Sequence, residues 1–284
     1  MSRRAPGRVR RAPVLLVLCC VLTACALPGA LVPTPTPLPP AGTPQVVAVA
    51  CPESLAPLMM ALAAAYQRDE PSVQVVVVSR ADVLAFQALS DGDANIVALA
   101  WLPVALPEGG WAELFARDGL AIVVHPSHGI PGLTMEQLRL LFRGRVEDWV
   151  PWGGLPGAPQ IISREEASGE YRFFQQQVMK DARVSLTALV APTSDAVLQS
   201  VGGDTLAVGY LSTAWLTGQV RPLAIEGIPP TYETIAAGLY PLTRDLFFVT
   251  LEEPHGATRD FVQWVLGPEG QQVVVARRFV SVSQ

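Results

Sequence analysis

The sequence predicts an α/β protein built around a mainly parallel sheet. Half of its 284 residues are hydrophobic while only 16% are charged, which is enough apolar material for a sizeable core. From residue 45 onward, short apolar runs alternate with segments that have helical periodicity. Strands that alternate with helices form parallel sheets with right-handed crossovers, and such sheets bind ligands outside the carboxyl ends of their strands.

The alternation begins with an apolar strand at Gln45–Ala50 and a helix at Ser54–Arg68. Val73–Ser79 is a continuous β-branched run, as expected of a strand buried on both faces. The other expected elements are a helix at Ala81–Ser90, a strand at Asn95–Ala100, a strand at Gly119–Val124, a helix that begins with a capping signature at Thr134 and Gln137, a strand at Ile161–Ser163 followed by a helix through Val178, a strand at Leu246–Leu251 and a helix at Arg259–Leu266.

The first 24 residues have the pattern of an export signal. Five arginines and no acidic residue precede an apolar run at Val14–Thr23, which is too short to span a bilayer comfortably. The run ends in Leu22-Thr23-Ala24-Cys25, which resembles a bacterial lipobox. The resemblance implies cleavage before Cys25 and lipidation of its thiol, so we expect an extracytoplasmic protein anchored to the cell membrane. An uncleaved helix anchor or an ordinary signal peptide is the alternative.

Residues 25–44 form a predicted linker, because seven prolines in residues 26–44 favour an extended spacer without a core.

The chain after residue 24 carries a formal net charge of −10, which argues against a nucleic-acid partner bound through a broad basic surface. Only Cys51 remains in that part, so a disulfide scaffold is excluded. His125 and His128 form a loose pair in a loop, and we expect no metal site and no cofactor.

Several segments, in the right order and spacing, resemble the phosphate-binding proteins that serve Pst-type ABC importers. They are Thr134–Gly154, Ile162–Gly169, Val208–Leu211, Ala224–Thr231, Tyr240–Leu246 and Phe261–Gln271.

The resemblance implies a type II periplasmic-binding-protein fold, in which two α/β lobes are joined by two crossing strands and enclose the ligand between them. Lobe one would comprise residues 45–120 and 246–284, and lobe two residues 125–240. The crossing strands would be Gly119–Val124 and Leu246–Leu251. Ligand would favour the closed state because only that state contacts it from both lobes.

Arg164, Ser168 and Gly169 carry the strongest chemical signal for a ligand site. An arginine offers a two-pronged contact to an oxyanion, and a serine cap followed by glycine exposes N–H groups and a hydroxyl at a helix start. The resemblance also implies hydroxyl donors at Ser54 and Ser79. Without the family resemblance, the serines would be interpreted as structural helix caps and Arg164 as a surface arginine.

Two positions depart from the family pattern. The chain has Ala100-Trp101 where the family commonly has an aspartate or serine, and Ser168-Gly169-Glu170 where it has Ser-Gly-Thr. The family's aspartate accepts the proton of phosphate and thereby rejects fully ionised oxyanions. Glu170 has three interpretations: it faces solvent and complements the helix dipole, it pairs with Arg164 and fills the pocket, or it takes over the proton-acceptor role.

The sequence therefore favours a solute-binding lipoprotein that captures phosphate or a related small oxyanion for an ABC permease. No nucleophile elbow or phosphate-binding glycine loop is present, so we expect no enzyme. The alternative is a ligand-poor or different-ligand lipoprotein of the same fold that acts as a sensor or interaction module.

Overall fold

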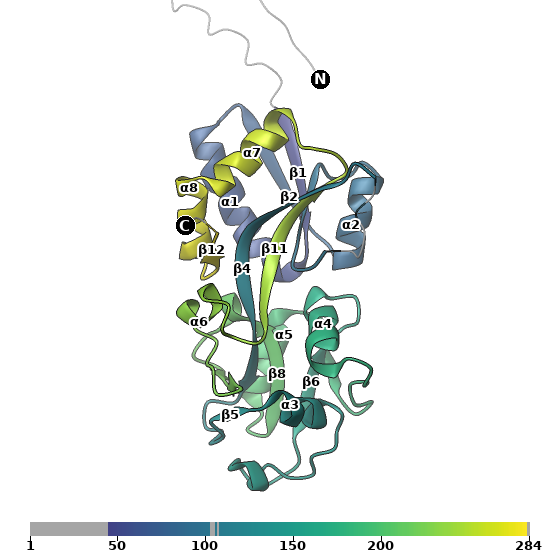
Figure 1. Cartoon of the computed structure of the whole chain (residues 1–284), viewed down its shortest axis with the longest axis vertical. Helices are drawn as coiled ribbons and strands as arrows, with labels where there is room; N and C mark the ends of the chain where they lie inside the picture. Colours follow the sequence, from purple (N-terminus) through teal and green to yellow (C-terminus); the bar gives the residue numbers. More distant parts are fainter. Residues whose placement is uncertain (1–44, 103–105, 107, 283–284) are drawn as a thin grey trace, which may run out of the picture. The chain divides into compact units, whose positions relative to one another are not determined.

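The predicted alternation of strands and helices is present in the computed structural model, which describes residues 45–102, 106 and 108–282 (Figure 1). The predicted signal peptide, Cys25 and the proline-rich linker lie outside the described residues. None of the helices in the described ranges is long and apolar enough to cross a membrane.

Three parallel strands form the centre of the first lobe: β1 (Gln45–Cys51) lies between β2 (Val73–Ser79) and β3 (Ile96–Leu99). Side chains of α1 (Ala56–Asp69), α7 (Gly256–Leu266) and α8 (Pro268–Ala276) pack with one face of the sheet. Those of α2 (Asp82–Ser90) pack with the other face. The first lobe is thus a sheet between two helical layers, and the last helices of the chain belong to it.

The second lobe continues the same sheet in the order β8 (Ala207–Ser212), β6 (Gln160–Arg164) and β7 (Leu189–Ala191). Its helices are α3 (Met135–Phe142), α4 (Gly169–Phe174), α5 (Ser194–Gly203) and α6 (Tyr232–Ala236), and its short strands are β5 (Gly132–Leu133), β9 (Arg221–Pro222) and β10 (Ala224–Ile225). The last strand of the chain, β12 (Val280–Ser281), follows α8 and pairs with Ala116 and Arg117.

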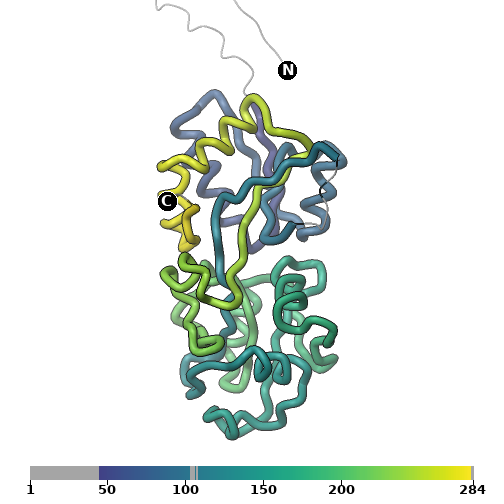
Figure 2. The backbone as a smooth tube through the Cα atoms, viewed as in Figure 1, coloured from purple at the N-terminus to yellow at the C-terminus, as the bar shows by residue number. Residues whose placement is uncertain are grey.

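Two long antiparallel strands, β4 (Trp111–Val124) and β11 (Thr243–Thr250), run side by side from one lobe into the other (Figures 1 and 2). The first part of β4 pairs with β11, whereas Leu120–Val124 pairs with β8. The strand begins eight residues before the predicted Gly119–Val124. Its first half was missed because charged residues interrupt the apolar ones there, so it lacks the continuous apolar run that signals a buried strand. Both lobes therefore share these strands.

Each lobe has its own aromatic centre. Phe115 and Phe248, from the two crossing strands, stack with ring centroids 4.0 Å apart in the first lobe. Phe174 stacks on Tyr210 at 4.3 Å in the second lobe. All four rings are fully buried. Their stacking holds β4 against β11 in the first lobe and α4 against β8 in the second.

The capping signature predicted at Thr134 is confirmed. Its hydroxyl accepts from the amide of Gln137 at 3.1 Å, and the Gln137 side chain accepts from the amide of Thr134 at 2.8 Å. These two bonds satisfy amides that a helix start leaves without partners.

Replacing Thr134 with alanine removes half of this capping box, and we expect the free energy of unfolding to fall by about 1 kcal/mol. The matched control is Thr205→Ala, because Thr205 is an exposed threonine of the same lobe and should change stability by less than about 0.5 kcal/mol. Urea unfolding of both variants and the wild type measures the difference. Equal stability of the two variants would contradict the assigned role of the cap.

Candidate functional site

A cavity of about 180 Å³ lies between the two lobes, where the carboxyl ends of β1 and β2 face the carboxyl end of β6. Four of the predicted site residues line it: Ser79 from the first lobe, and Arg164, Ser168 and Glu170 from the second. Gly169 lies between the last two and contacts the first lobe through its amide. The structure thus brings five of the six predicted residues to one place.

Arg164 ends β6 and is 3% exposed. One guanidinium nitrogen donates to the hydroxyl of Ser194 and the other to the carbonyl of Pro192, both at 3.2 Å. The guanidinium also pairs with Glu53 at 3.5 Å and with Glu170 at 3.6 Å. Its Nε–H has no hydrogen-bond partner among the described residues. A buried donor of this kind is costly unless something accepts from it.

Glu170 is 1% exposed, so the solvent-facing interpretation does not describe it. Its Oε1 accepts from the guanidinium of Arg244 at 3.1 and 3.2 Å, and its Oε2 faces Arg164. Burial alone would raise the pKa of Glu170, but the positive charges of Arg244 and Arg164 outweigh it and hold that pKa below its usual value. Glu170 is therefore an ionised carboxylate held between two arginines.

Arg244 and Asp118 continue this ion-pair chain into the crossing strands. Arg244, on β11, donates to Oδ2 of Asp118, on β4, at 2.6 and 3.1 Å. The other oxygen of Asp118 accepts from the hydroxyl of Thr213 at 2.8 Å. Burial opposes the charge on Arg244, but the carboxylates of Asp118 and Glu170 raise its pKa above the ordinary value. The four residues from Arg164 to Asp118 thus form one buried network, half of which lies in the strands that join the lobes.

Asp82 was not among the predicted site residues, yet it joins the lobes. It begins α2, and its Oδ2 accepts from the amide of Gly169 at 2.6 Å. Its Oδ1 accepts from the indole N–H of Trp101 at 3.2 Å. Burial, with the nearby negative charge of Glu170, raises the pKa of Asp82 to about 6. The only sequence signal was its place in the first turn of the helix after Ser79.

The two serines at helix starts differ. The hydroxyl of Ser168 caps α4, since it accepts from the amide of Tyr171 at 3.1 Å and donates to the carbonyl of Glu165 at 2.9 Å. Ser54 is buried and lines a separate cavity of about 360 Å³, but its hydroxyl lies close enough to the carboxylate of Glu170 to help lower the pKa of that group. Leu55 rather than Ser54 precedes α1, so Ser54 does not cap that helix.

Trp101 is half-buried at the end of β3 and bounds this region. The guanidinium of Arg172 lies 5.1 Å from its ring centroid, and its N–H is used by Asp82. Its indole is thereby fixed by an arginine on one side and a carboxylate on the other.

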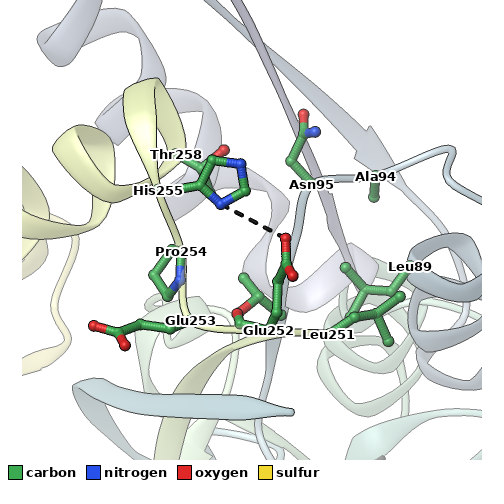
Figure 3. Close-up of a pocket in the computed structure, with 10 residues that line it drawn as sticks. Leu89, Ala94, Asn95, Leu251, Glu252, Glu253, Pro254, His255 and Thr258 are labelled. Atoms are coloured by element: carbon green, nitrogen blue, oxygen red, sulfur yellow. Dashed lines mark hydrogen bonds and ion pairs between the residues drawn. The ribbon is translucent and has the colours of Figure 1, made fainter. Parts of the chain in front are cut away.

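A larger pocket, of about 370 Å³, lies in the first lobe next to the loop between β11 and α7 (Figure 3). Glu252 in this pocket pairs with the exposed His255 at 3.6 Å, while Glu253 points away from that pair. Among the described residues, no lysine or arginine lines this pocket, so its charge suits an anion poorly.

Within the part of the chain that the structure describes, no group of three or more histidine, cysteine, aspartate or glutamate residues is arranged to hold a metal ion. The ring of His125 contacts the hydroxyl of Ser127 at 2.7 Å, whereas the ring of His128 is buried against Trp149 with centroids 4.6 Å apart. The two histidines therefore have separate surroundings.

The chain is similar to phosphate-binding proteins named PstS. It is 28% identical over 266 residues to that of Pseudomonas aeruginosa, covering 80% of each chain. It is 21% identical over 240 residues to that of Bacillus subtilis, covering 78% of this chain and 75% of the relative. The sequence-based resemblance is confirmed by these relatives.

Solved structures share the fold. A putative phosphate ABC transporter substrate-binding protein with bound phosphate from Clostridium perfringens matches with a TM-score of 0.78 at 23% identity, over 84% of this chain and all of the other. An ABC-type phosphate transport receptor from Vibrio cholerae matches with a TM-score of 0.73 at 25% identity, over 82% and 99%. The predicted type II periplasmic-binding fold is therefore confirmed. Since the family model described as "PBP superfamily domain" matches residues 38–269, the chain belongs to the PBP superfamily.

Proposed function

We propose that the protein is the extracytoplasmic solute-binding component of an ABC importer and captures phosphate or a related small oxyanion in the Arg164 cavity. The observation that carries the proposal is the buried Arg164, whose Nε–H has no acceptor among the described residues although it belongs to a cavity-lining side chain. An oxyanion supplies such an acceptor, with a charge-assisted bond. The relatives named as phosphate-binding proteins support the same assignment and favour binding over catalysis.

Both lobes contribute polar groups to the cavity, as a receptor that closes on its ligand requires. Ser79 and Arg80 come from the first lobe, and Arg164 and Ser168 from the second. A ligand that contacts both sides shifts the equilibrium toward the closed state by its differential affinity for that state. A volume of about 180 Å³ suits a small anion with few waters rather than a large organic solute.

A second candidate function is that of a ligand-poor sensor or interaction module. The specific observation in its favour is the pairing of Arg164 with Glu170 and Glu53, which supplies negative charge from within the protein. The two functions differ in whether phosphate binds at all, so a direct titration separates them.

We infer that Cys25 carries the lipid anchor, on the strength of the lipobox-like sequence that precedes it. In a bacterial host, Cys25→Ser should move the chain from the membrane fraction to the soluble extracytoplasmic fraction, because a serine cannot form the thioether to lipid. Immunoblots of the fractions measure this, and Cys51→Ser is the control that removes a buried thiol of the body. Retention of Cys25→Ser in the membrane fraction at wild-type levels would contradict the anchor.

Replacing Arg164 with alanine should weaken phosphate binding by a factor of about 100 or more, since hydrogen bonds to charged groups contribute about 1.5–3 kcal/mol and a charge is lost as well. Isothermal titration of the full-length chain with phosphate measures the change. Arg164→Lys keeps the positive charge but lacks the planar guanidinium with its paired N–H donors, so it should recover part of the affinity.

Arg139→Ala is the matched control, because Arg139 is an arginine of the same lobe whose Nε–H donates to the carbonyl of Val178, away from the cavity. If Arg164→Ala folds and binds phosphate as tightly as wild type, the Arg164 cavity is not the ligand site.

Glu170→Gln tests the role of the buried carboxylate. Removing its charge leaves Arg164 more available, so we expect phosphate to bind about tenfold tighter, which corresponds to about 1.4 kcal/mol. The same change should reduce the free energy of unfolding by about 3–5 kcal/mol, because a buried ion pair loses one partner. Titration and denaturant unfolding measure the two effects separately. A folded variant that binds phosphate more weakly, or that gains sulfate binding instead, would favour Glu170 as the acceptor of the phosphate proton.

A further inference from the structure

We propose that the carboxylate of Asp82 is an internal competitor of the anion. It accepts the hydrogen bond of the Gly169 amide, and this bond must break before a free oxyanion can accept from the same amide. This inference rests on the proposed function, and it adds a residue that sets the affinity of the site and its dependence on pH.

The first ground is the geometry of the contact. The carboxylate of Asp82 comes from the first lobe and the amide of Gly169 from the second, and they meet at 2.6 Å. Gly169 belongs to the Ser-Gly turn that the sequence marks as the anion-binding segment, and Asp82 itself lines the cavity. A carboxylate is chemically close to an oxyanion, since both present negative oxygens that accept from N–H groups.

The second ground is the space around Gly169. A Cβ atom at this position would lie 2.5 Å from Oδ1 of Asp82, which is shorter than any allowed contact. The turn therefore admits this carboxylate only because residue 169 has no side chain. The second oxygen of Asp82 is held by the indole of Trp101 at 3.2 Å, so the side chain is fixed in its place from two directions.

The third ground is the balance of charge. The buried carboxyl groups outnumber the buried guanidinium groups near the cavity, because Asp82, Asp118 and Glu170 lie with Arg164 and Arg244. The partly buried Glu53 adds a further negative charge. Adding a further anion to this set increases the excess of negative charge, which burial makes costly. The cost falls when one carboxyl group leaves or takes up a proton.

Asp82 is the carboxyl group best placed to take up that proton. Burial, together with the charge of Glu170, raises its pKa to about 6. When protonated, it loses most of its strength as an acceptor from Gly169 and gains a hydrogen that it can donate to the ligand. Anion binding should therefore strengthen as pH falls through this value. The charged and titratable groups that face Asp82 are Cys51 on β1, Glu170 on α4 and Arg244 on β11, with Glu53, Arg80, Arg164 and Glu165 around the same cavity.

The test is isothermal titration of the full-length chain with inorganic phosphate, for wild type and Asp82→Ala, at about pH 7.5 and about pH 5. Phosphate itself changes protonation in this range, so the ratio of the two dissociation constants at each pH is the readout. We expect Asp82→Ala to bind tighter by roughly 10- to 30-fold at pH 7.5, because ionised Asp82 then exceeds the protonated form by about 30-fold. The ratio should approach one at pH 5.

Two further variants keep the test decisive. Asp82→Asn preserves the side-chain shape in case the alanine variant does not fold, and it should also bind tighter at pH 7.5. Asp91→Ala is the matched control, because it removes an exposed aspartate at the other end of α2 and should leave the ratio near one at both pH values.

The outcomes separate this proposal from the proposed function. If wild type binds phosphate and the Asp82 variants bind it equally or more weakly, Asp82 is not a competitor while the receptor function stands. If only the Asp82 variants bind, the competitor is supported in its strongest form. If no variant binds phosphate at either pH, both the proposed function and the competitor are overturned.

Discussion

The site depends on one carboxylate held between two arginines inside the protein. Glu170 is nearly inaccessible to solvent, and Arg164 and Arg244 each contact a different one of its two oxygens. Removing each of these charges from water costs several kcal/mol, which only close pairing offsets. Arg244 is paired in turn with Asp118, so the charges form a chain in which each member is compensated by its neighbours. The loss of any one removes a charged partner from at least one buried neighbour.

This chain connects the ligand cavity with the strands that join the lobes. Arg164 lines the cavity, whereas Arg244 and Asp118 lie on β11 and β4, which pair with each other along the crossing. Any rotation of one lobe relative to the other must bend or twist these two strands. We therefore expect a change of charge at Arg164, such as the arrival of an anion, to be sensed by the segment that must bend.

The sequence predicted the parallel strands, the capping box and the family resemblance, because those signals are local or follow the order of the chain. It also predicted Arg164 and the Ser168-Gly169 turn. Glu170 was predicted as well, and one of its interpretations was the pairing with Arg164. Arg244, Asp118 and Asp82 escaped prediction because they are remote in the sequence: Arg244 lies 74 residues from Glu170 and 126 from Asp118, and Asp82 lies 87 from Gly169. No periodicity relates residues so far apart.

Ser54 shows the opposite limit of sequence reasoning. The resemblance implied a hydroxyl donor to the ligand at this position. Ser54 lines a different cavity and its hydroxyl lies by the carboxylate of Glu170, whereas its neighbour Glu53 lines the Arg164 cavity and contacts Arg164. The turn after β1 thus presents a carboxylate to the cavity where the resemblance implied a neutral donor. Such a change alters the charge of the site without altering the fold, which is set by the buried apolar residues on either side.

The location of the bound anion is the most direct test of the account. In crystals of the full-length chain grown with arsenate, an isosteric analogue of phosphate, the anomalous difference map marks the arsenic atom. We predict a single strong peak in the cavity, within hydrogen-bonding reach of arsenate oxygens from Arg164 and with the carboxylate of Asp82 moved off the amide of Gly169. A peak elsewhere, or an undisturbed Asp82–Gly169 bond with no peak at saturating arsenate, would contradict the account.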